Sequence, residues 1–344
     1  MTIKPIPLKQ QWPFVGTHLQ TVRMNFRNDH PDVSQMNPSA IQVPMNDGTG
    51  DIITGVVHTP PKQRYPGLLV VAGHGFGGDA DSAYMKWITK FFFDQDIAVC
   101  RLNLRGAGNS RPLCRDNYHG ARGEDLIRFW DWLLAAKEPA VPFKVTRTYF
   151  AGTSLSGSVL ANAFAKIDDN SVGTVSDLSG VIGGLGLCFA FDMQTSARKI
   201  HSAMNWPYLQ YLLGKVKPLF DVQPGLDQAT KTRIAAATSL IDIDDIWTAP
   251  HLGFASAFEF YKHASGRLWV PHSKRPFRVV ATLNDPWIDP QGFLDADWSN
   301  PLLEPKMFTH GGHCGLWERG HLYQRHFREA FDHIESLLGP ADVS

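Results

Sequence analysis

The 344-residue sequence has no excess of charge of either sign, because 33 Lys and Arg residues balance 33 Asp and Glu residues. Proteins that bind nucleic acid or an anionic membrane surface usually carry a clear basic excess. Neither class of partner is therefore expected. The sequence also has no apolar run that reaches the roughly 20 residues of a membrane span, and its amino terminus lacks the apolar stretch of a signal peptide.

Cysteine is scarce as well, with four residues in the chain: Cys100, Cys114, Cys188 and Cys314. They are scattered without the spacing of a metal-binding motif, so no metal is expected. Few, unpatterned cysteines suggest a reduced, intracellular protein, and the cytoplasm is the expected compartment. The sequence has no obvious repeats and no low-complexity tail, and thus gives no sign of a repeat architecture.

Apolar residues, in contrast, make up 43% of the chain, enough for a large core in one domain with insertions or in two domains. Apolar runs of strand length cover residues 52–58, 67–72, 97–104, 180–191 and 277–283, with a short run at 306–309. Helical patterns at 84–93, 123–136 and 319–338 stand between and after them. Continuous apolar runs are typical of strands buried on both faces. This alternation predicts an α/β fold with a mostly parallel central sheet and helices on both faces.

Residues 192–267 interrupt the alternation, since this segment is mostly helical in pattern and rich in aromatic residues. An insertion of this kind between two strands is typical of a cap over the carboxyl edge of the sheet, where ligands bind. Most of its aromatic side chains are expected to anchor the cap, and a few to line an acyl pocket. We therefore expect an amino-terminal extension (1–50) packed on the core, a core of 51–191 and 268–344, and a helical cap of 192–267.

The most informative stretch is residues 145–164, which reads strand, sharp turn, helix. Ser154 stands at the turn, in the segment GTSLSG (152–157). A serine on such a strained turn presents its hydroxyl above the sheet edge, and residues two positions away on each side must be small. Gly152 and Ser156 meet that need, although the usual motif has a second glycine at Ser156. The plain alternative is a tight turn that simply suits small residues.

A glycine-rich loop, HGFGG (74–78), follows the second apolar run of the core. Glycine lets the backbone approach a ligand closely, so His74 and Gly75 are candidate substrate-binding residues. In hydrolases with a serine at a strand–helix turn, this loop supplies one oxyanion-binding N–H and the residue after the serine supplies the other. The candidates here are the N–H groups of Phe76 and Leu155. The alternative is a plain glycine turn into the next helix.

An acid and a base follow the later strands. Asp285 comes directly after the run 277–283, with Asp289 as the second choice, and a turn aspartate before proline is the competing interpretation. His313 lies between glycines in GGHCG (311–315), and His310 is its competitor nearer the strand. The order Ser154, Asp285, His313 is that of α/β-hydrolases. Because each residue follows a predicted strand, all three are expected at one rim of the sheet.

Further motifs stand along nearly the whole chain. They are HLQT (18–21), HGFGG (74–78) with DSAYM (81–85), NLRGAGNS (103–110) with Tyr118-His119, DIDD (242–245) with Gly253-Phe254 and Phe260-Tyr261, and GGHCG (311–315). Together they resemble the signatures of YheT-like α/β-hydrolases, a family related to eukaryotic abhydrolase-domain esterases and medium-chain phospholipases. Two positions depart from the family pattern: Ser156 replaces the elbow glycine, and Asn284 replaces the first of two aspartates.

The resemblance implies the α/β-hydrolase fold and hydrolysis of carboxylic esters, with some members transferring acyl groups to alcohols. The leading hypothesis is a serine esterase for short- to medium-chain acyl esters that works through an acyl-enzyme and needs no cofactor. An acyltransferase or a lipase or phospholipase is the alternative within the enzyme class. A non-catalytic binding protein on a hydrolase fold is the alternative from another class. The expected partner is a small-molecule or lipid ester.

Overall fold

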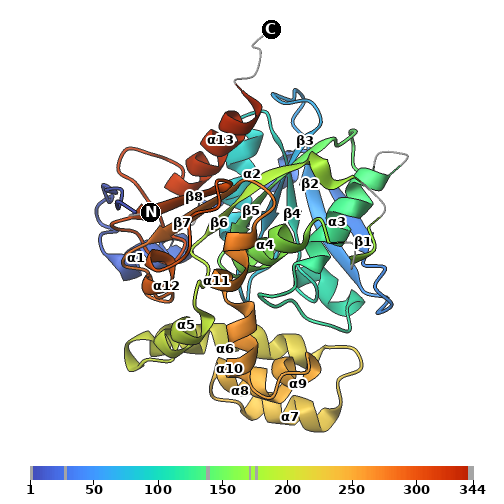
Figure 1. Cartoon of the computed structure of the whole chain (residues 1–344), viewed down its shortest axis with the longest axis vertical. Coiled ribbons are helices and arrows are strands. Elements are labelled where there is room, and N and C mark those ends of the chain that lie inside the picture. Colours follow the sequence, from blue (N-terminus) through green and yellow to red (C-terminus); the bar gives the residue numbers. More distant parts are fainter. Residues whose placement is uncertain (1–2, 27–28, 137–139, 170–171, 175–176, 340–344) are drawn as a thin grey trace.

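A twisted sheet forms the centre of the computed structural model, which describes residues 3–26, 29–136, 140–169, 172–174 and 177–339. Within these residues the sheet has eight strands in the order β1-β2-β4-β3-β5-β6-β7-β8 (Figure 1). The strands are β1 (Pro38–Pro44), β2 (Ile52–His58), β3 (Leu68–Gly73), β4 (Ala98–Leu102), β5 (Arg147–Thr153), β6 (Val181–Leu187), β7 (Phe277–Thr282) and β8 (Leu303–Phe308).

The six neighbouring strands β4, β3, β5, β6, β7 and β8 run parallel. At one side of the sheet, β2 pairs antiparallel with β4, and β1 pairs antiparallel with β2. The predicted α/β-hydrolase fold with a mostly parallel sheet is therefore confirmed. Parallel strands place all their carboxyl ends at one edge, where ligands bind in open α/β sheets. The loops after β3, β5, β7 and β8 meet at this edge.

The strand β1 lies before Asp51, where the sequence pattern placed the start of the core. Its side chains alternate between exposed and buried, with Ile41 and Val43 facing the core. Proline at both ends and a short alternating pattern suit an edge strand but give a weak signal in sequence. In contrast, β3 is buried along its whole length, as its continuous apolar run predicts.

Helices cover both faces of the sheet (Figure 1). Helices α2 (Ala83–Phe93) and α13 (Arg325–Leu338) pack in one apolar cluster with the sheet, and α3 (Glu124–Ala135) and α4 (Leu155–Lys166) in another. Helix α13 begins later than the predicted residue 319. The residues before it form a turn instead, in which Gly320 has φ 82° and the Arg319 N–H donates to the Lys9 carbonyl.

Seven further helices lie between β6 and β7 and gather beyond one edge of the sheet (Figure 1). They are α5 (Met193–Ile200), α6 (Trp206–Asp221), α7 (Gln228–Ala236), α8 (Leu240–Ile243), α9 (Ala249–His251), α10 (Ala257–Ala264) and α11 (Gly266–Trp269), and a π-helical turn (Asp244–Thr248) joins α8 to α9. The insertion has an apolar cluster of its own, which includes Leu209, Val216, Phe220 and Ile234. The predicted helical insertion before the strand that precedes Asp285 is confirmed.

The remaining short elements are helices α1 (Thr17–Val22) and α12 (Gln291–Leu294), and 3-10 turns at Arg23–Phe26, Val33–Gln35, Gly108–Leu113, Leu178–Gly180, Ala203–Asn205 and Val270–His272. In the part of the chain that the structure describes, every helix is too short or too polar to cross a membrane.

Candidate active site

Ser154 joins the end of β5 to the start of α4 with a positive φ of 52° and a ψ of −120°. This conformation is uncommon for residues other than glycine, and such strain concentrates at functional sites. The Ser154 N–H donates to the Leu187 carbonyl at 2.8 Å, which holds the turn against β6. A side chain at Gly152 would stand 2.8 Å from the Ser156 backbone, so the close approach of strand and helix requires glycine there.

Ser156, which occupies the place of the usual elbow glycine, is fully buried. Its hydroxyl donates a hydrogen bond to the His74 carbonyl in the loop after β3. The substitution therefore adds a direct link between the turn that carries Ser154 and the glycine-rich loop.

The structure brings Ser154, His313 and Asp285 together. His313 Nε2 lies 2.9 Å from the Ser154 Oγ, and His313 Nδ1 lies 3.0 Å from one Asp285 carboxylate oxygen and 3.2 Å from the other. Asp285 and His313 are both buried, with 3% and 6% exposure. A neutral imidazole with Nδ1–H toward the carboxylate leaves Nε2 free to accept the serine proton.

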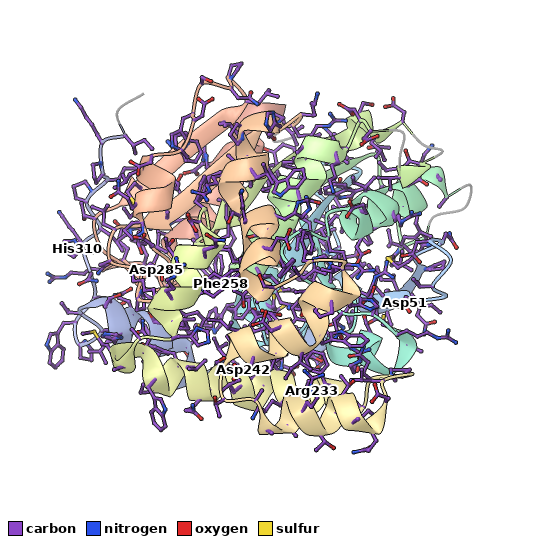
Figure 2. All side chains as sticks on the ribbon, turned by 60° about the horizontal axis from the view of Figure 1, so that its bottom comes forward. Asp51, Arg233, Asp242, Phe258, Asp285 and His310 are labelled. Carbon is purple, nitrogen blue, oxygen red and sulfur yellow. The ribbon has the colours of Figure 1, made fainter. Side chains whose placement is uncertain are left out.

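The two competing residues lie outside this arrangement. His310 is exposed near the periphery of the molecule, and its ring Nδ1 is bonded to Thr309 Oγ1 at 2.9 Å (Figure 2). Asp289 accepts the Gln291 N–H at 3.2 Å in the turn before α12.

The loop after β7 fixes the Asp285 carboxylate. Its Oδ1 accepts the N–H groups of Trp287 at 2.8 Å and Ile288 at 2.9 Å. From helix α5, Lys199 Nζ donates to the carbonyls of Asp285 at 2.7 Å and Ile288 at 2.9 Å. The Trp287 ring stacks on the His313 imidazole, with 4.2 Å between ring centroids. The helical insertion thus helps to hold the acid in place.

Burial of the His313 ring acts to lower its pKa, but the neighbouring Cys314 sulfur and the Asp285 carboxylate outweigh this and raise it above the ordinary value. Both neighbours favour the imidazolium form, which is the form that a base must reach during proton transfer. The environment therefore stabilises His313 after it has taken a proton.

Two N–H groups of the glycine-rich loop after β3 are bonded to tyrosine hydroxyls. The Gly75 N–H donates to the Tyr84 hydroxyl and the Gly77 N–H donates to the Tyr118 hydroxyl, both at 2.8 Å. Within the described residues, the N–H groups of Phe76 and Leu155 have no hydrogen-bond partner. These two groups are therefore available for an oxygen of a bound substrate.

His74 lies beneath the site rather than in the cavity lining. Its Nδ1 donates to the Gly75 carbonyl at 2.8 Å and its Nε2 accepts the Leu104 N–H at 3.1 Å. Burial lowers the pKa of His74 to about 4, which keeps the ring neutral. A side chain at Gly75 would approach the Ser154 Cβ to 3.1 Å, so this glycine lets the loop pass close to the serine.

Helix α1 supports the turn that carries His313. The Gln20 side chain accepts the Trp317 N–H at 2.9 Å, and the Thr21 hydroxyl accepts the His313 N–H at 2.8 Å. Thr21, Tyr84 and Tyr118 stand in or next to the quoted motifs, but residue patterns assigned them no role. Lys199 carried no sequence signal.

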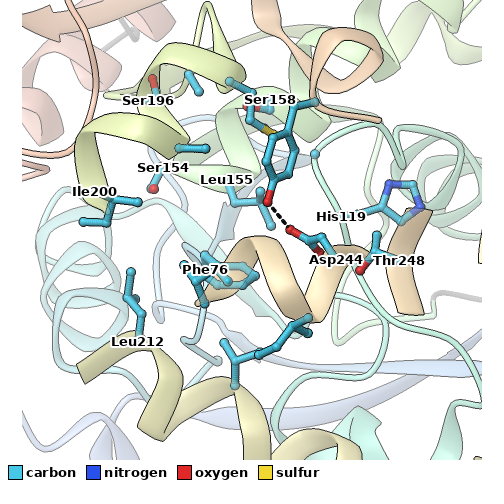
Figure 3. A pocket seen from close by; sticks show the side chains of 18 of the residues that line it. Phe76, His119, Ser154, Leu155, Ser158, Ser196, Ile200, Leu212, Asp244 and Thr248 are labelled. Atoms are coloured by element: carbon cyan, nitrogen blue, oxygen red, sulfur yellow. Dashed lines mark hydrogen bonds between the residues drawn. The ribbon is translucent and has the colours of Figure 1, made fainter. Parts of the chain in front are cut away.

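A cavity of about 180 Å³ opens beside Ser154. Its lining is largely apolar, with Phe76 and Leu155 at the sheet edge and Leu212 on α6 (Figure 3). Val216, also on α6, lines it as well. Polar side chains gather in one part of it. In the residues that the structure describes, no group of three or more His, Cys, Asp or Glu side chains could hold a metal ion.

No protein-family model matches the chain, but curated proteins do. An abhydrolase domain-containing protein of Dictyostelium discoideum is 27% identical over 254 residues, 72% of this chain and 61% of that protein. The putative esterase YheT of Escherichia coli is 22% identical over 271 residues, 78% of this chain and 76% of that protein. A monoacylglycerol lipase of Saccharomyces cerevisiae is 24% identical over 264 residues, 74% of this chain and 55% of that protein.

The chain thus spans less than two thirds of the Dictyostelium and yeast relatives. Among solved structures, an esterase of Pyrococcus furiosus is similar with a TM-score of 0.56 and 11% identity over 98% of both chains, a likeness that concerns the fold alone. The sequence relatives thus support the resemblance to YheT-like α/β-hydrolases, and the solved structure supports the α/β-hydrolase fold.

Proposed function

We propose that this protein is a serine hydrolase that cleaves carboxylic esters of short- to medium-chain acids through an acyl-enzyme. The observation that carries the proposal is the continuous hydrogen-bond path from Asp285 through His313 to Ser154, with both contacts of the imidazole near 3 Å. Relatives named esterase and lipase support ester hydrolysis independently of this geometry.

In the first half of the reaction, His313 Nε2 takes the proton of the Ser154 hydroxyl as its oxygen attacks the acyl carbon. The developing oxyanion accepts hydrogen bonds from the N–H groups of Phe76 and Leu155, and loss of one such donor typically costs about a hundred- to a thousandfold in rate. Asp285 keeps the imidazole in the required tautomer and stabilises the imidazolium. His313 then gives its proton to the leaving alcohol.

In the second half, His313 removes a proton from a water molecule, which attacks the acyl group on Ser154. The same oxyanion donors act again, and His313 returns the proton to Ser154 Oγ as the acid leaves. An alcohol in place of water would make the same step an acyl transfer. Stacking of the Trp287 ring on the imidazole favours its charged form in both halves.

We further propose that residues 192–267 act as a cap that forms the acyl pocket with the core. The pocket joins residues of both parts, such as Leu155 after β5 and Leu212 on α6. A dry cavity of about 150 Å³ holds one benzene molecule. The volume of about 180 Å³ therefore suits a short chain, and this supports short- to medium-chain substrates.

A reducing, cytoplasmic location is part of the same proposal. All four cysteines are free thiols, and Cys100, Cys114 and Cys188 are buried. Free thiols are typical of reducing compartments.

A fluorophosphonate probe tests the proposal directly, since it reacts with activated serine hydroxyls. We expect labelling of the wild-type chain and of Ser158→Ala, whose missing hydroxyl lies one helical turn from the nucleophile, and no labelling of Ser154→Ala. Hydrolysis of nitrophenyl esters of graded chain length should follow the same pattern, and added ethanol separates hydrolysis from alcoholysis. A folded wild-type chain that is neither labelled nor active on any ester would overturn the proposal.

A further inference from the structure

The part of the cavity away from Ser154 contains a group of polar side chains. Asp244 and Thr248 come from the π-helical turn, Tyr261 from α10 and His119 from the segment before α3, and all four line the cavity. Figure 3 shows Ser154 on one side of the view and Asp244, Thr248 and His119 on the other, with apolar side chains between them. A ligand that enters at the nucleophile would meet these groups at its far end.

Asp244 is the charged member of this group. The Tyr261 hydroxyl donates to its Oδ2 at 2.5 Å. The carboxyl group is surrounded by protein, and burial raises the pKa of Asp244 to about 6 against the opposing hydrogen bonds of Tyr261 and Thr248. The residue nevertheless is half-buried rather than fully buried, and it lines the cavity.

Among the described residues that line the cavity, Asp244 is the one carboxylic acid, and neither Lys nor Arg accompanies it. His201 also lines the cavity, but its Nε2 accepts the Leu240 N–H at 3.1 Å and its Nδ1 lies 2.6 Å from the Ala197 carbonyl, a pattern that a neutral ring satisfies. Burial lowers the pKa of His119 to about 3, so this ring is neutral. A buried carboxylate without a counter-ion is costly unless hydrogen-bond donors satisfy it. An ionised carboxylate has roughly four lone-pair positions. The Tyr261 hydroxyl occupies one of them, and Thr248 stands beside the same group, so positions stay open for a further donor.

The hydrogen bond from Tyr261 to Asp244 is one of two side-chain links between the π-helical turn and α10. Asp245 accepts the Ala257 N–H at 2.5 Å and so ties the π-helical turn to the start of α10. Ser239 and Asp242 form the capping box of α8. The π-helical turn places Asp244 toward the cavity while Asp245 is exposed. Isolated π-helical turns occur frequently at functional sites.

We propose that Asp244, supported by Tyr261, is a specificity-determining subsite for a hydroxyl group carried on the substrate chain, remote from the ester bond. The proposal deepens the proposed ester hydrolysis and rests on it. A hydroxyl satisfies the open carboxylate positions by donating one hydrogen bond. The apolar walls between Ser154 and Asp244 accommodate the carbon chain that joins the hydroxyl to the ester.

The test compares kcat/KM for matched ester pairs at pH 8, where Asp244 is ionised. One arm uses ethyl esters of straight-chain acids of graded length and their ω-hydroxy counterparts. The other uses acetates of straight-chain alcohols and of the matching diols. The arms distinguish a hydroxyl on the acyl side from one on the alcohol side. We expect a preference of about ten- to a hundredfold for the hydroxylated ester in one arm, the range for a hydrogen bond to a charged group.

Variants of Asp244 test whether its carboxylate causes the preference for hydroxylated esters. Asp244→Leu should abolish or reverse it. Asp244→Asn keeps the shape of the side chain and should reduce it, which covers the case in which the leucine variant does not fold. Asp245→Asn removes the same charge one residue along, outside the cavity, and should leave the preference unchanged.

Two results would overturn the proposal that Asp244 forms a hydroxyl-binding subsite. Equal kcat/KM within every pair in both arms, with Ser154 labelled and plain esters hydrolysed, would remove the subsite and leave the proposed function standing. Absence of both labelling and hydrolysis would instead remove the proposed function, and the subsite with it.

Discussion

The Thr21 hydroxyl accepts the backbone N–H of His313 at 2.8 Å, although the two residues are 292 positions apart in the chain. Thr21 in turn donates to the Thr17 carbonyl at 2.8 Å, so its hydroxyl is fixed by helix α1. A side chain at Gly312 would come within 2.4 Å of the Thr21 oxygen, and the glycine lets the turn press against the helix. Helix α1, in the amino-terminal segment, therefore helps to hold the backbone of His313 in place.

Thr21→Val should impair catalysis because it removes this acceptor and leaves the His313 N–H unpaired. We expect kcat to fall about tenfold, with KM little changed, since small displacements of a reacting group are costly. Thr21→Ser keeps the hydroxyl and should restore most of the rate. Steady-state kinetics on one nitrophenyl ester, with urea unfolding as a check on folding, measures the effect. Equal kcat for Thr21→Val and wild type would contradict the support role.

Asp285→Asn should lower kcat on the order of 10⁴-fold with the fold intact, because the amide favours the wrong imidazole tautomer. Asp289→Asn is the matched control, four residues along the same loop, and should stay within a few-fold of wild type. Similar losses in both variants would point to a general disturbance of the loop and count against Asp285 as the acid of the triad.

The pH profile should reflect the raised pKa of His313. The base must be neutral to take the serine proton, so kcat/KM should increase with pH through an apparent pKa above 6.5 and then level off. Cys314→Ala removes one neighbour that raises the pKa of His313, and the acidic limb should move to lower pH. Cys100→Ala, a buried cysteine in the sheet core, should leave the limb in place. A wild-type limb at or below pH 6.5 would contradict this assignment.

Ser156→Gly restores the glycine of the usual elbow motif but should destabilise this protein. The His74 carbonyl loses a hydrogen bond, which typically contributes about 1 kcal/mol, and glycine in a helix costs about 1 kcal/mol more than alanine. Ser156→Ala removes only the first contribution. Urea unfolding of the three proteins separates the two effects. Wild-type stability in the glycine variant would mean that the hydroxyl has no structural role.

Arg105 should be a large contributor to stability. Its guanidinium is fully buried and pairs with Asp47 at 2.7 Å, Asp51 at 2.9 Å and Asp125 at 2.6 Å. Arg105→Met leaves these carboxylates uncompensated, and we expect a loss of about 3–5 kcal/mol in the free energy of unfolding. Arg275→Met breaks a more exposed pair with Asp168 and should cost at most about 1 kcal/mol. Comparable losses for the two would contradict this difference.

The same network gives stability a dependence on acid. Burial acts to raise the pKa of Asp47, but hydrogen bonds from Thr49 and Arg105 outweigh it and hold the pKa below the ordinary value. The contribution of this carboxylate is therefore present above about pH 4 and is lost as the pH falls further. Urea unfolding at pH 6 and near pH 3 should show a smaller decrease in Asp47→Asn than in wild type.

The sequence by itself determined the local elements. Residues 52–58 form a strand in the structure, as predicted. The small residues Gly152 and Ser156 on either side of Ser154 correctly indicated a strand, a sharp turn and a helix. These features depend on the periodicity of the backbone and on steric limits between residues that are close in the chain. The order of residues in the sequence is therefore enough to predict them. The order of Ser154, Asp285 and His313 along the chain likewise indicated a shared edge, because each follows a parallel strand.

Tertiary structure alone decided which distant polar groups meet. Thr21 beneath His313, Lys199 against the Asp285 loop and Tyr118 on the Gly77 N–H join residues from separate loops and helices. Strand β1 was not predicted for a related reason. Its short alternation of exposed and buried residues is a weak signal in sequence, and β1 is recognised as a strand by its pairing with β2 in the structure. Asp244 looks in sequence like one of several acidic residues in a helical segment. A single polar side chain has no period, and its partners are set by how the whole chain packs.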